Sequence, residues 1–137
     1  MERKEIESEM IVRLFQTSNA LQTFLDRDLK KVDLTAKQFY MMIIIGSFKE
    51  DPKLIDIANR FKTSQQNVRQ VLNKLTKAGY TSLYKDAKDS RITRVKLTNQ
   101  AIDFWKTRDH DDEISMRRVF NMSSKEDLST TLNTLIN

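Results

Sequence analysis

The segment TSQQNVRQVLNKLTKAGY, at positions 63–80, restricts the fold of this chain more than any other. Its apolar residues Val68, Val71, Leu72 and Leu75 recur at three- and four-residue steps, which predicts a helix with one buried side. A second apolar stripe, LIDIANRF, ends only two or three residues before this helix begins. Two short helices joined by so tight a turn must cross at a large angle, so the pair predicts a helix-turn-helix.

Two strands are expected directly after this helix. Gly79 can take the left-handed conformation that ends a helix, and the segments YTSLYK and ITRVKL that follow read as strands. The loop between them, DAKDSR, is too long for a two-residue hairpin turn and carries cations at its third and sixth positions. A helix-turn-helix followed by a basic hairpin is a winged helix.

The other predicted elements are long helices, because only two glycines and one proline interrupt the chain. An amphipathic helix is expected over 5–31, and a second helix is expected to start at a Thr35 cap and to run through a mostly buried stretch at 39–45. A third helix is expected to have Asp51 as its N-cap and Pro52 in its first position.

These elements predict a mainly α fold with a small β-hairpin. A winged helix-turn-helix lobe is expected at about 35–98, and long terminal helices, with more apolar surface than a small winged helix covers, are expected to form a dimerisation lobe at about 4–31 and 99–136. The length of 137 residues suits one core, so a single domain over 1–137 is expected.

Composition excludes several classes of protein. The absence of cysteine rules out disulfides, thiolate metal sites and cysteine nucleophiles, and it favours a cytoplasmic location. The first ten residues, MERKEIESEM, have no apolar core of a signal peptide, and the longest apolar run is far shorter than the roughly 20 residues that span a bilayer. No membrane association and no cofactor are expected.

The basic residues cluster in the middle of the sequence. Ten lysines and arginines but only two aspartates lie between positions 59 and 99, which gives this segment a charge of +8 within a chain of net charge +5. The remaining residues therefore carry −3. A basic centre between acidic ends is typical of a surface for a polyanion, although a solvated charged face has the same composition.

The outward positions of the helix in the opening segment carry amides and cations in place of the usual acids. Glutamine and asparagine match the major-groove edge of adenine, and arginine matches guanine in the same bidentate way. Hydroxyls and backbone N–H groups at the start of such a helix suit a phosphate. The candidate DNA-binding residues on this helix are Thr63, Ser64, Gln65, Gln66, Arg69, Gln70, Asn73 and Lys74.

The hairpin supplies a second group of candidate DNA-binding residues, namely Lys85, Lys88, Asp89, Arg91 and Arg94. Asp89 cannot approach a phosphate without repulsion, so we expect it to orient Arg91 through an ion pair.

The segments LIDIANRF, TSQQNVRQVLNKLTKAGY and KDAKDSRITRVKLT together resemble the core of the MarR family of bacterial transcriptional regulators. Asp89, Ser90 and Arg91, followed by Leu97 and Thr98, match the family's D-x-R and L-T pattern in the wing. The segment LTAKQF is similar to the entry into the family's second helix, and VFNMSSKEDLSTTLNTLI is similar to its C-terminal helix. The chain departs from the pattern in the alanine that takes the place of the glycine after the L-T pair.

The resemblance implies a homodimer that binds palindromic double-stranded operator DNA, usually as a repressor that a small-molecule effector relieves. It also implies that the first, fifth and sixth helices form the dimer interface. The helix with Gln66 and Arg69 would enter the major groove, and Arg91 would reach the minor groove. The alternative is a winged-helix protein-interaction module, such as an antirepressor or an assembly partner, that does not read DNA.

An effector would bind where the first, second and fifth helices meet the winged-helix lobe. Its expected lining consists of Arg13, Leu14, Lys37, Phe39, Met42 and Phe104. The acidic run DHDDE at 109–113 has oxygen ligands for a divalent cation, but such runs are usually solvated, so no metal site is expected. The sequence contains no motif of a phosphate-binding loop or of a nucleophile with a neighbouring base. No catalytic residue and no enzyme activity are therefore expected.

Overall fold

The structure is a computed structural model that describes residues 1–108 and 124–136. The chain divides into two compact units, Met1–Ala101 and Ile102–Asn137. Within the described residues, no helix is both long and apolar enough to cross a membrane.

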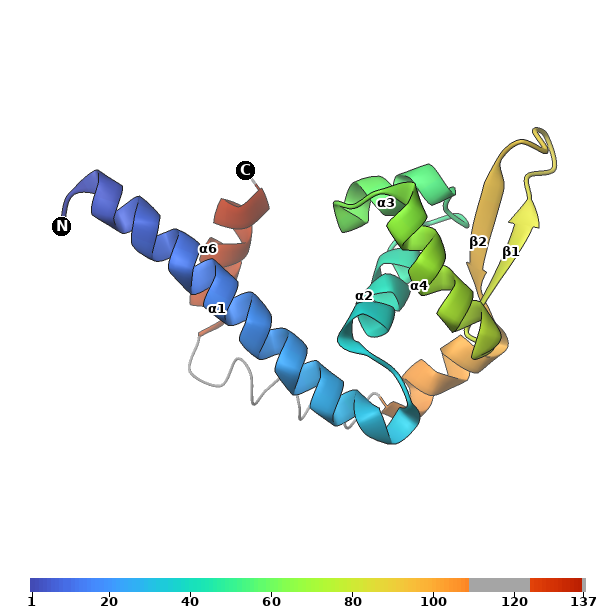
Figure 1. Ribbon diagram of the computed structural model, residues 1–137, viewed down its shortest axis with the longest axis horizontal. Coiled ribbons are helices and arrows are strands. Elements are labelled where there is room, and N and C mark those ends of the chain that lie inside the picture. The colour runs from blue at the N-terminus through green and yellow to red at the C-terminus, as the bar shows by residue number, and fades with distance from the viewer. Residues whose placement is uncertain (109–123, 137) are drawn as a thin grey trace. The chain divides into compact units, whose positions relative to one another are not determined.

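The first unit begins with the long helix α1, Arg3–Leu29, which continues into the 3-10 turn Lys30–Val32 (Figure 1). Asp33 follows with a left-handed φ of 56°, which ends the turn. Leu29 is fully buried, whereas Phe15 in the first half of α1 is 69% exposed. The helix predicted for 5–31 is confirmed, and most of its apolar stripe has no partner within the first unit.

Helix α2, Ala36–Gly46, starts at the predicted cap. The Gln38 N–H donates to the Thr35 hydroxyl at 3.2 Å, and the Thr35 N–H donates back to the Gln38 side chain at 2.9 Å. This reciprocal capping box satisfies two backbone donors that the helix start leaves unpaired. Met41 and Met42 are fully buried, so α2 forms the centre of the core of the first unit.

Helix α3, Leu54–Phe61, begins later than the sequence predicts. Lys53 is its N-cap, and the N–H of Lys53 donates to the Asp56 carboxylate at 3.3 Å. The prediction that Asp51 caps the helix and that Pro52 is its first residue is therefore wrong.

The physical reason is that residues 51–53 pair with the hairpin. The Pro52 carbonyl accepts a hydrogen bond from the Val95 N–H at 2.9 Å, and Lys53 forms an antiparallel bridge with Arg94. This extended pairing is incompatible with helical backbone angles.

Helix α4, Gln65–Lys77, lies against α2 and α3. Its side chains Val68, Leu72 and Leu75 are fully buried, as the sequence period predicts. Burial of three such side chains stabilises the fold by roughly 1.5–3 kcal/mol each. This packing fixes which face of α4 points outward.

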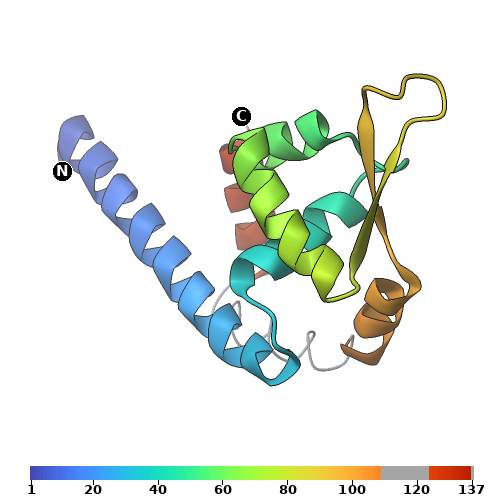
Figure 2. The same ribbon diagram turned by 45° about the vertical axis from the view of Figure 1, so that its right-hand side comes forward.

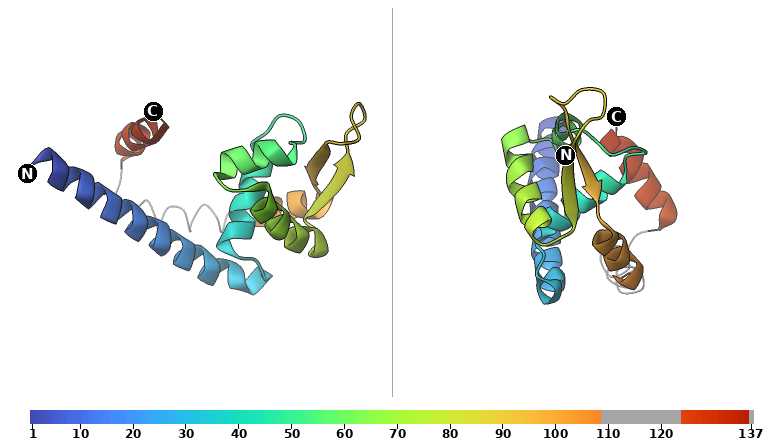
Figure 3. Two further views of the ribbon diagram at one scale, coloured as in Figure 1. Left: turned by 45° about the horizontal axis from the view of Figure 1, so that its top comes forward. Right: turned by 90° about the vertical axis from the view of Figure 1, so that its right-hand side faces the viewer.

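Strands β1, Thr81–Lys85, and β2, Thr93–Leu97, form an antiparallel hairpin in which Leu83 lies opposite Val95. The hairpin contacts α4 through β1 and contacts α2 and α3 through β2. Figures 2 and 3 show the hairpin beside α4, with the loop at 86–92 projecting past the helices of the first unit. The predicted winged helix is confirmed.

In the second unit, residues 102–108 are helical and α6 spans Lys125–Ile136. The Ser124 hydroxyl accepts from the Asp127 N–H at 3.0 Å and caps α6. Phe104 meets Trp105 edge-on, and the Arg108 guanidinium lies 5.3 Å from the centre of the Phe104 ring. The acidic run at 109–113 lies outside the described residues.

Candidate nucleic-acid interface

The turn before α4 determines where its N-terminus lies. Lys62 ends α3 with a left-handed φ of 59°, and the Thr63 N–H donates to the Ala58 carbonyl at 3.1 Å. Ser64 is the N-cap of α4, and its hydroxyl accepts from the Asn67 N–H at 3.2 Å. A tight turn and a capped helix start thus hold α4 at a fixed angle to α3.

The outward face of α4 carries Gln66, Arg69, Gln70 and Asn73, all of which are exposed. Within the described residues, no hydrogen bond or ion pair engages any of their side chains. Side chains with several donors and acceptors and no partner in the fold are available to a ligand with a matching pattern. Their exposure agrees with the sequence analysis, and their contacts with DNA stay a prediction.

The N-terminal turn of α4 adds hydroxyl and amide groups. The Asn67 side-chain amide donates to the Thr63 hydroxyl at 2.9 Å, which orients Thr63. The hydroxyls of Thr63 and Ser64 accept hydrogen bonds here, and each keeps its proton to donate to a phosphate. Gln65 is exposed beside them. Asn67 is not among the predicted site residues, although its four-residue spacing from Thr63 is the signal that predicts this contact.

Two lysines extend the exposed face toward the C-terminus of α4. Lys74, a predicted site residue, is exposed, and so is Lys77, which the sequence analysis did not include. Lys77 follows Gln66, Gln70 and Asn73 at steps of four, three and four residues, so it lies on the same side of the helix. That spacing was readable from the sequence.

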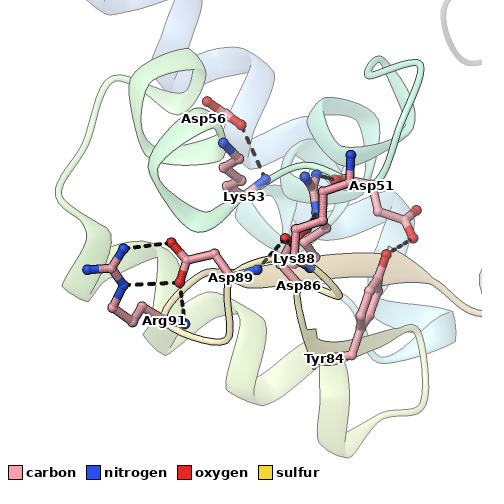
Figure 4. A network of polar contacts seen from close by, with 9 residues as sticks. Asp51, Lys53, Asp56, Tyr84, Asp86, Lys88, Asp89 and Arg91 are labelled. Atoms are coloured by element: carbon pink, nitrogen blue, oxygen red, sulfur yellow. Dashed lines mark hydrogen bonds and ion pairs between the residues drawn. The ribbon is translucent and has the colours of Figure 1, made fainter.

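The tip of the wing presents Arg91 and Lys88. The side chain of Arg91 is 89% exposed, and its guanidinium donates to both Asp89 oxygens, from Nε at 3.0 Å and from Nη2 at 2.9 Å (Figure 4). The hydrogen bond from Arg91 lowers the pKa of the Asp89 carboxyl below its ordinary value. The expected ion pair is confirmed. Lys88 is also exposed, and the Lys85 ammonium donates to the Thr93 hydroxyl at 3.3 Å.

Arg94 lies in different surroundings from the other predicted wing residues. Its side chain is only 23% exposed, and its guanidinium donates to the Asp86 carboxylate at 2.5 Å and to the Asp51 carbonyl at 2.7 Å. These contacts direct its Nε and Nη1 donors into the protein, and the DNA contact of Arg94 stays a prediction. Asp86, which the sequence analysis did not select, is its partner.

The residues predicted to line one effector pocket differ in their burial and in their contacts. Phe39 and Met42 are buried in the core of the first unit, while Leu14 is 52% exposed on α1. Arg13 pairs with Glu9 at 2.6 Å. Lys37 lies on a separate, open groove of about 960 Å³. Phe104 belongs to the second unit.

The groove beside Lys37 lies between the end of α1, the start of α2 and the outer side of α4. Its polar lining includes Gln22, Asp26, Lys30, Gln70, Lys74 and Lys77. Among the residues that the structure describes, no group of histidine, aspartate and glutamate side chains is arranged to hold a metal ion.

Comparisons with known proteins agree with this geometry. Residues 34–101 match the family model described as a winged helix DNA-binding domain. No curated protein matches the sequence closely enough to count as a relative.

Solved structures are similar over nearly the whole chain. The MarR protein from Peptoclostridium difficile has a TM-score of 0.81 and 21% sequence identity, with 98% of this chain and 88% of that chain covered. The regulator BldR from Sulfolobus solfataricus has a TM-score of 0.84 and 17% identity, with 99% and 98% covered. A mutant MarR from E. coli, solved in complex with operator DNA, has a TM-score of 0.82 and 14% identity, with 98% and 96% covered.

Proposed function

We propose that this chain is a MarR-type regulator that reads a palindromic operator as a homodimer and represses transcription from it. Residues 34–101 match a winged helix DNA-binding domain, and the fold is that of solved MarR structures. The observation that carries the proposal is the outward face of α4. Gln66, Arg69, Gln70 and Asn73 are exposed there without partners in the described chain, beside a wing whose tip presents Arg91. The protein binds in this way and does not catalyse a reaction, and it acts in the cytoplasm.

The outward face of α4 and the wing tip suit different parts of the DNA. The amides and the guanidinium of α4 suit base edges in the major groove, whereas Thr63, Ser64 and Lys74 suit phosphates. Arg91 at the wing tip suits the minor groove, where a narrow A·T-rich stretch has the most negative potential.

The dimer is supported by apolar side chains that the fold leaves exposed. On α1 the exposed apolar residues are Ile6, Met10, Ile11, Val12, Leu14 and Phe15. On α6, Leu128, Leu132 and Leu135 are 37%, 58% and 64% exposed and recur at steps of four and three residues. Apolar stripes of this extent are typical of an interface, and a two-fold interface uses the same residues from both copies.

Assembly can be tested with a charged substitution in this stripe. Light scattering at micromolar concentration should give a dimer for the wild type and a smaller species for Leu14→Glu. Gln16→Glu adds the same charge at an exposed polar position of α1 and should stay dimeric. A wild-type protein that is a stable monomer contradicts the dimer.

An effector site is a further part of the proposal. The groove beside Lys37 suits an aromatic acid, because Lys30, Lys37, Lys74 and Lys77 surround it against Asp26 and Asp33. A ligand there would lie against the outer side of α4 and would change how that helix meets DNA. Aromatic acids should raise the melting temperature of the wild type and should do so less for Lys37→Ala, and no shift with any of them contradicts the site.

Selection of binding sequences from random DNA duplexes tests the proposed function. The wild type should enrich an inverted repeat whose half-sites lie about one helical turn, roughly 34–36 Å, apart. Enrichment of no sequence, combined with only weak salt-sensitive binding, would instead support a winged-helix module that contacts proteins.

A further inference from the structure

The base of the wing is tied to the connection between α2 and α3 by a chain of polar contacts (Figure 4). The Tyr84 hydroxyl donates to the Asp51 carboxylate at 2.5 Å, and the Arg94 guanidinium donates to the Asp51 carbonyl at 2.7 Å. The Val95 N–H donates to the Pro52 carbonyl at 2.9 Å. Both strands of the hairpin are therefore attached to the same three-residue segment of the helical lobe.

Asp86 continues this chain of contacts toward the tip. One of its oxygens accepts from Arg94, and the other accepts from the N–H groups of Lys88 and Asp89, each at 3.0 Å. The Asp86 side chain is only 13% exposed. The hydrogen bond from Arg94, followed by the N–H groups of Asp89 and Lys88, lowers the pKa of Asp86 below its ordinary value.

A two-stranded hairpin has little stability of its own, so its position depends on what it is attached to. Hydrogen bonds with a charged donor or acceptor are about twice as strong as neutral ones, and a guanidinium can direct two of them at once in a fixed plane. The link from Asp51 through Arg94 and Asp86 reaches the backbone of Asp89, whose carboxylate holds Arg91.

We propose that Arg94 is a positioning residue for DNA reading, which fixes the wing tip relative to α4 through Asp86 and Asp51 and does not itself contact DNA. The inference rests on the proposed function. In this inference, the partly buried Arg94 of β2 holds Arg91 at the position where the minor groove of bound DNA will lie.

A double-mutant cycle distinguishes positioning from direct contact. Arg94→Met keeps most of the side-chain length but has no donors. If Arg94 acts through Arg91, then Arg94→Met should reproduce most of the affinity loss of Arg91→Ala on the selected site, and the double variant should be little worse than either single one. Losses that simply add, or no loss for Arg94→Met, overturn the inference.

Arg94→Lys is the second test, because it keeps the charge. An ammonium can neutralise a phosphate, but it cannot hold the Asp86 carboxylate and the Asp51 carbonyl in the same geometry. The lysine variant should therefore bind DNA about as poorly as Arg94→Met. Recovery of wild-type affinity by lysine shows a phosphate contact and contradicts positioning.

A measurement without DNA separates this inference from the proposed function. NMR backbone order parameters of residues 87–91 should fall in Arg94→Met and Arg94→Lys, while those of α4 and the thermal unfolding of the helices should change little. Tyr84→Phe removes only one hydroxyl of the network and should lower the same order parameters less. Unchanged order in the arginine variants overturns the inference, whereas a wild type that binds no DNA overturns the proposed function.

Discussion

The Asp89 carboxylate accepts three hydrogen bonds from Arg91, from its side-chain Nε at 3.0 Å, its Nη2 at 2.9 Å and its backbone N–H at 3.0 Å. An acid at the tip of a wing that is to meet DNA repels phosphates. Its bidentate contact nevertheless holds the most exposed guanidinium of the hairpin in one orientation. Asp89 therefore favours DNA binding by orienting Arg91 and disfavours it by repelling phosphates.

Asp89→Ala should weaken DNA binding, because loss of a fixed Arg91 outweighs the removal of one negative charge. Charge counting alone expects tighter binding. Glu126→Ala is a matched control, since it removes an exposed acid of α6, outside the winged helix. The test compares the DNA affinity of the wild type and of the Asp89 variant at one salt concentration. Tighter binding by the variant shows that Arg91 needs no orienting partner.

Acid should loosen the wing only well below neutral pH. The folded-state pKa values of Asp86 and Asp89 lie below the ordinary value, mainly because of hydrogen bonds from Arg94 and Arg91 respectively. A carboxyl with a depressed pKa contributes stability above its unfolded pKa and loses that contribution as the pH falls through the folded pKa. NMR signals of the Lys88 and Asp89 N–H groups should be constant from pH 8 to 5 and change below about pH 4. A change centred between pH 5 and 7 contradicts these contacts.

Lys88→Ala should weaken binding to all DNA sequences to a similar extent. Lys88 is an exposed cation at the wing, so its loss should also lower the slope of log affinity against log salt by about one. Lys4→Ala makes the same charge change on α1 and should leave the slope unaltered. A sequence-dependent loss for Lys88→Ala shows that this lysine reads bases.

Gly79→Ala should destabilise the protein by roughly 1–2 kcal/mol, because φ at this position is 87° and only glycine adopts it freely. An added Cβ would also lie 2.4 Å from the Gln100 side-chain oxygen. Thermal or urea unfolding measures the loss. Gly46→Ala is the control, because its Cβ would meet Leu97 at an ordinary 3.5 Å, and stability there should change little or rise.

The elements that the sequence predicted correctly depend on neighbours in the chain. The Thr35 cap, the left-handed Gly79 just after α4 and the pair of Asp89 with Arg91 each involve residues at most four positions apart. Local spacing and side-chain chemistry are enough for such features.

The errors arise where contacts join distant parts of the chain. Asp51 and Pro52 are residue types that often start a helix, but pairing with β2 keeps this segment extended. The hydrogen bond from the Arg94 guanidinium to a carbonyl 43 residues earlier could not be predicted from the sequence for the same reason. No local pattern predicts which strand a loop will meet.

The most direct test of the central claim compares base reading with general attraction to DNA. Gln66→Ala and Arg69→Ala should each weaken binding to the selected inverted repeat by about 1–3 kcal/mol and leave binding to unrelated duplexes nearly unchanged. The matched controls Gln16→Ala and Arg27→Ala, on exposed positions of α1, should alter neither affinity. The account is contradicted if Gln66 and Arg69 can both be truncated with no change in the ratio of specific to non-specific affinity.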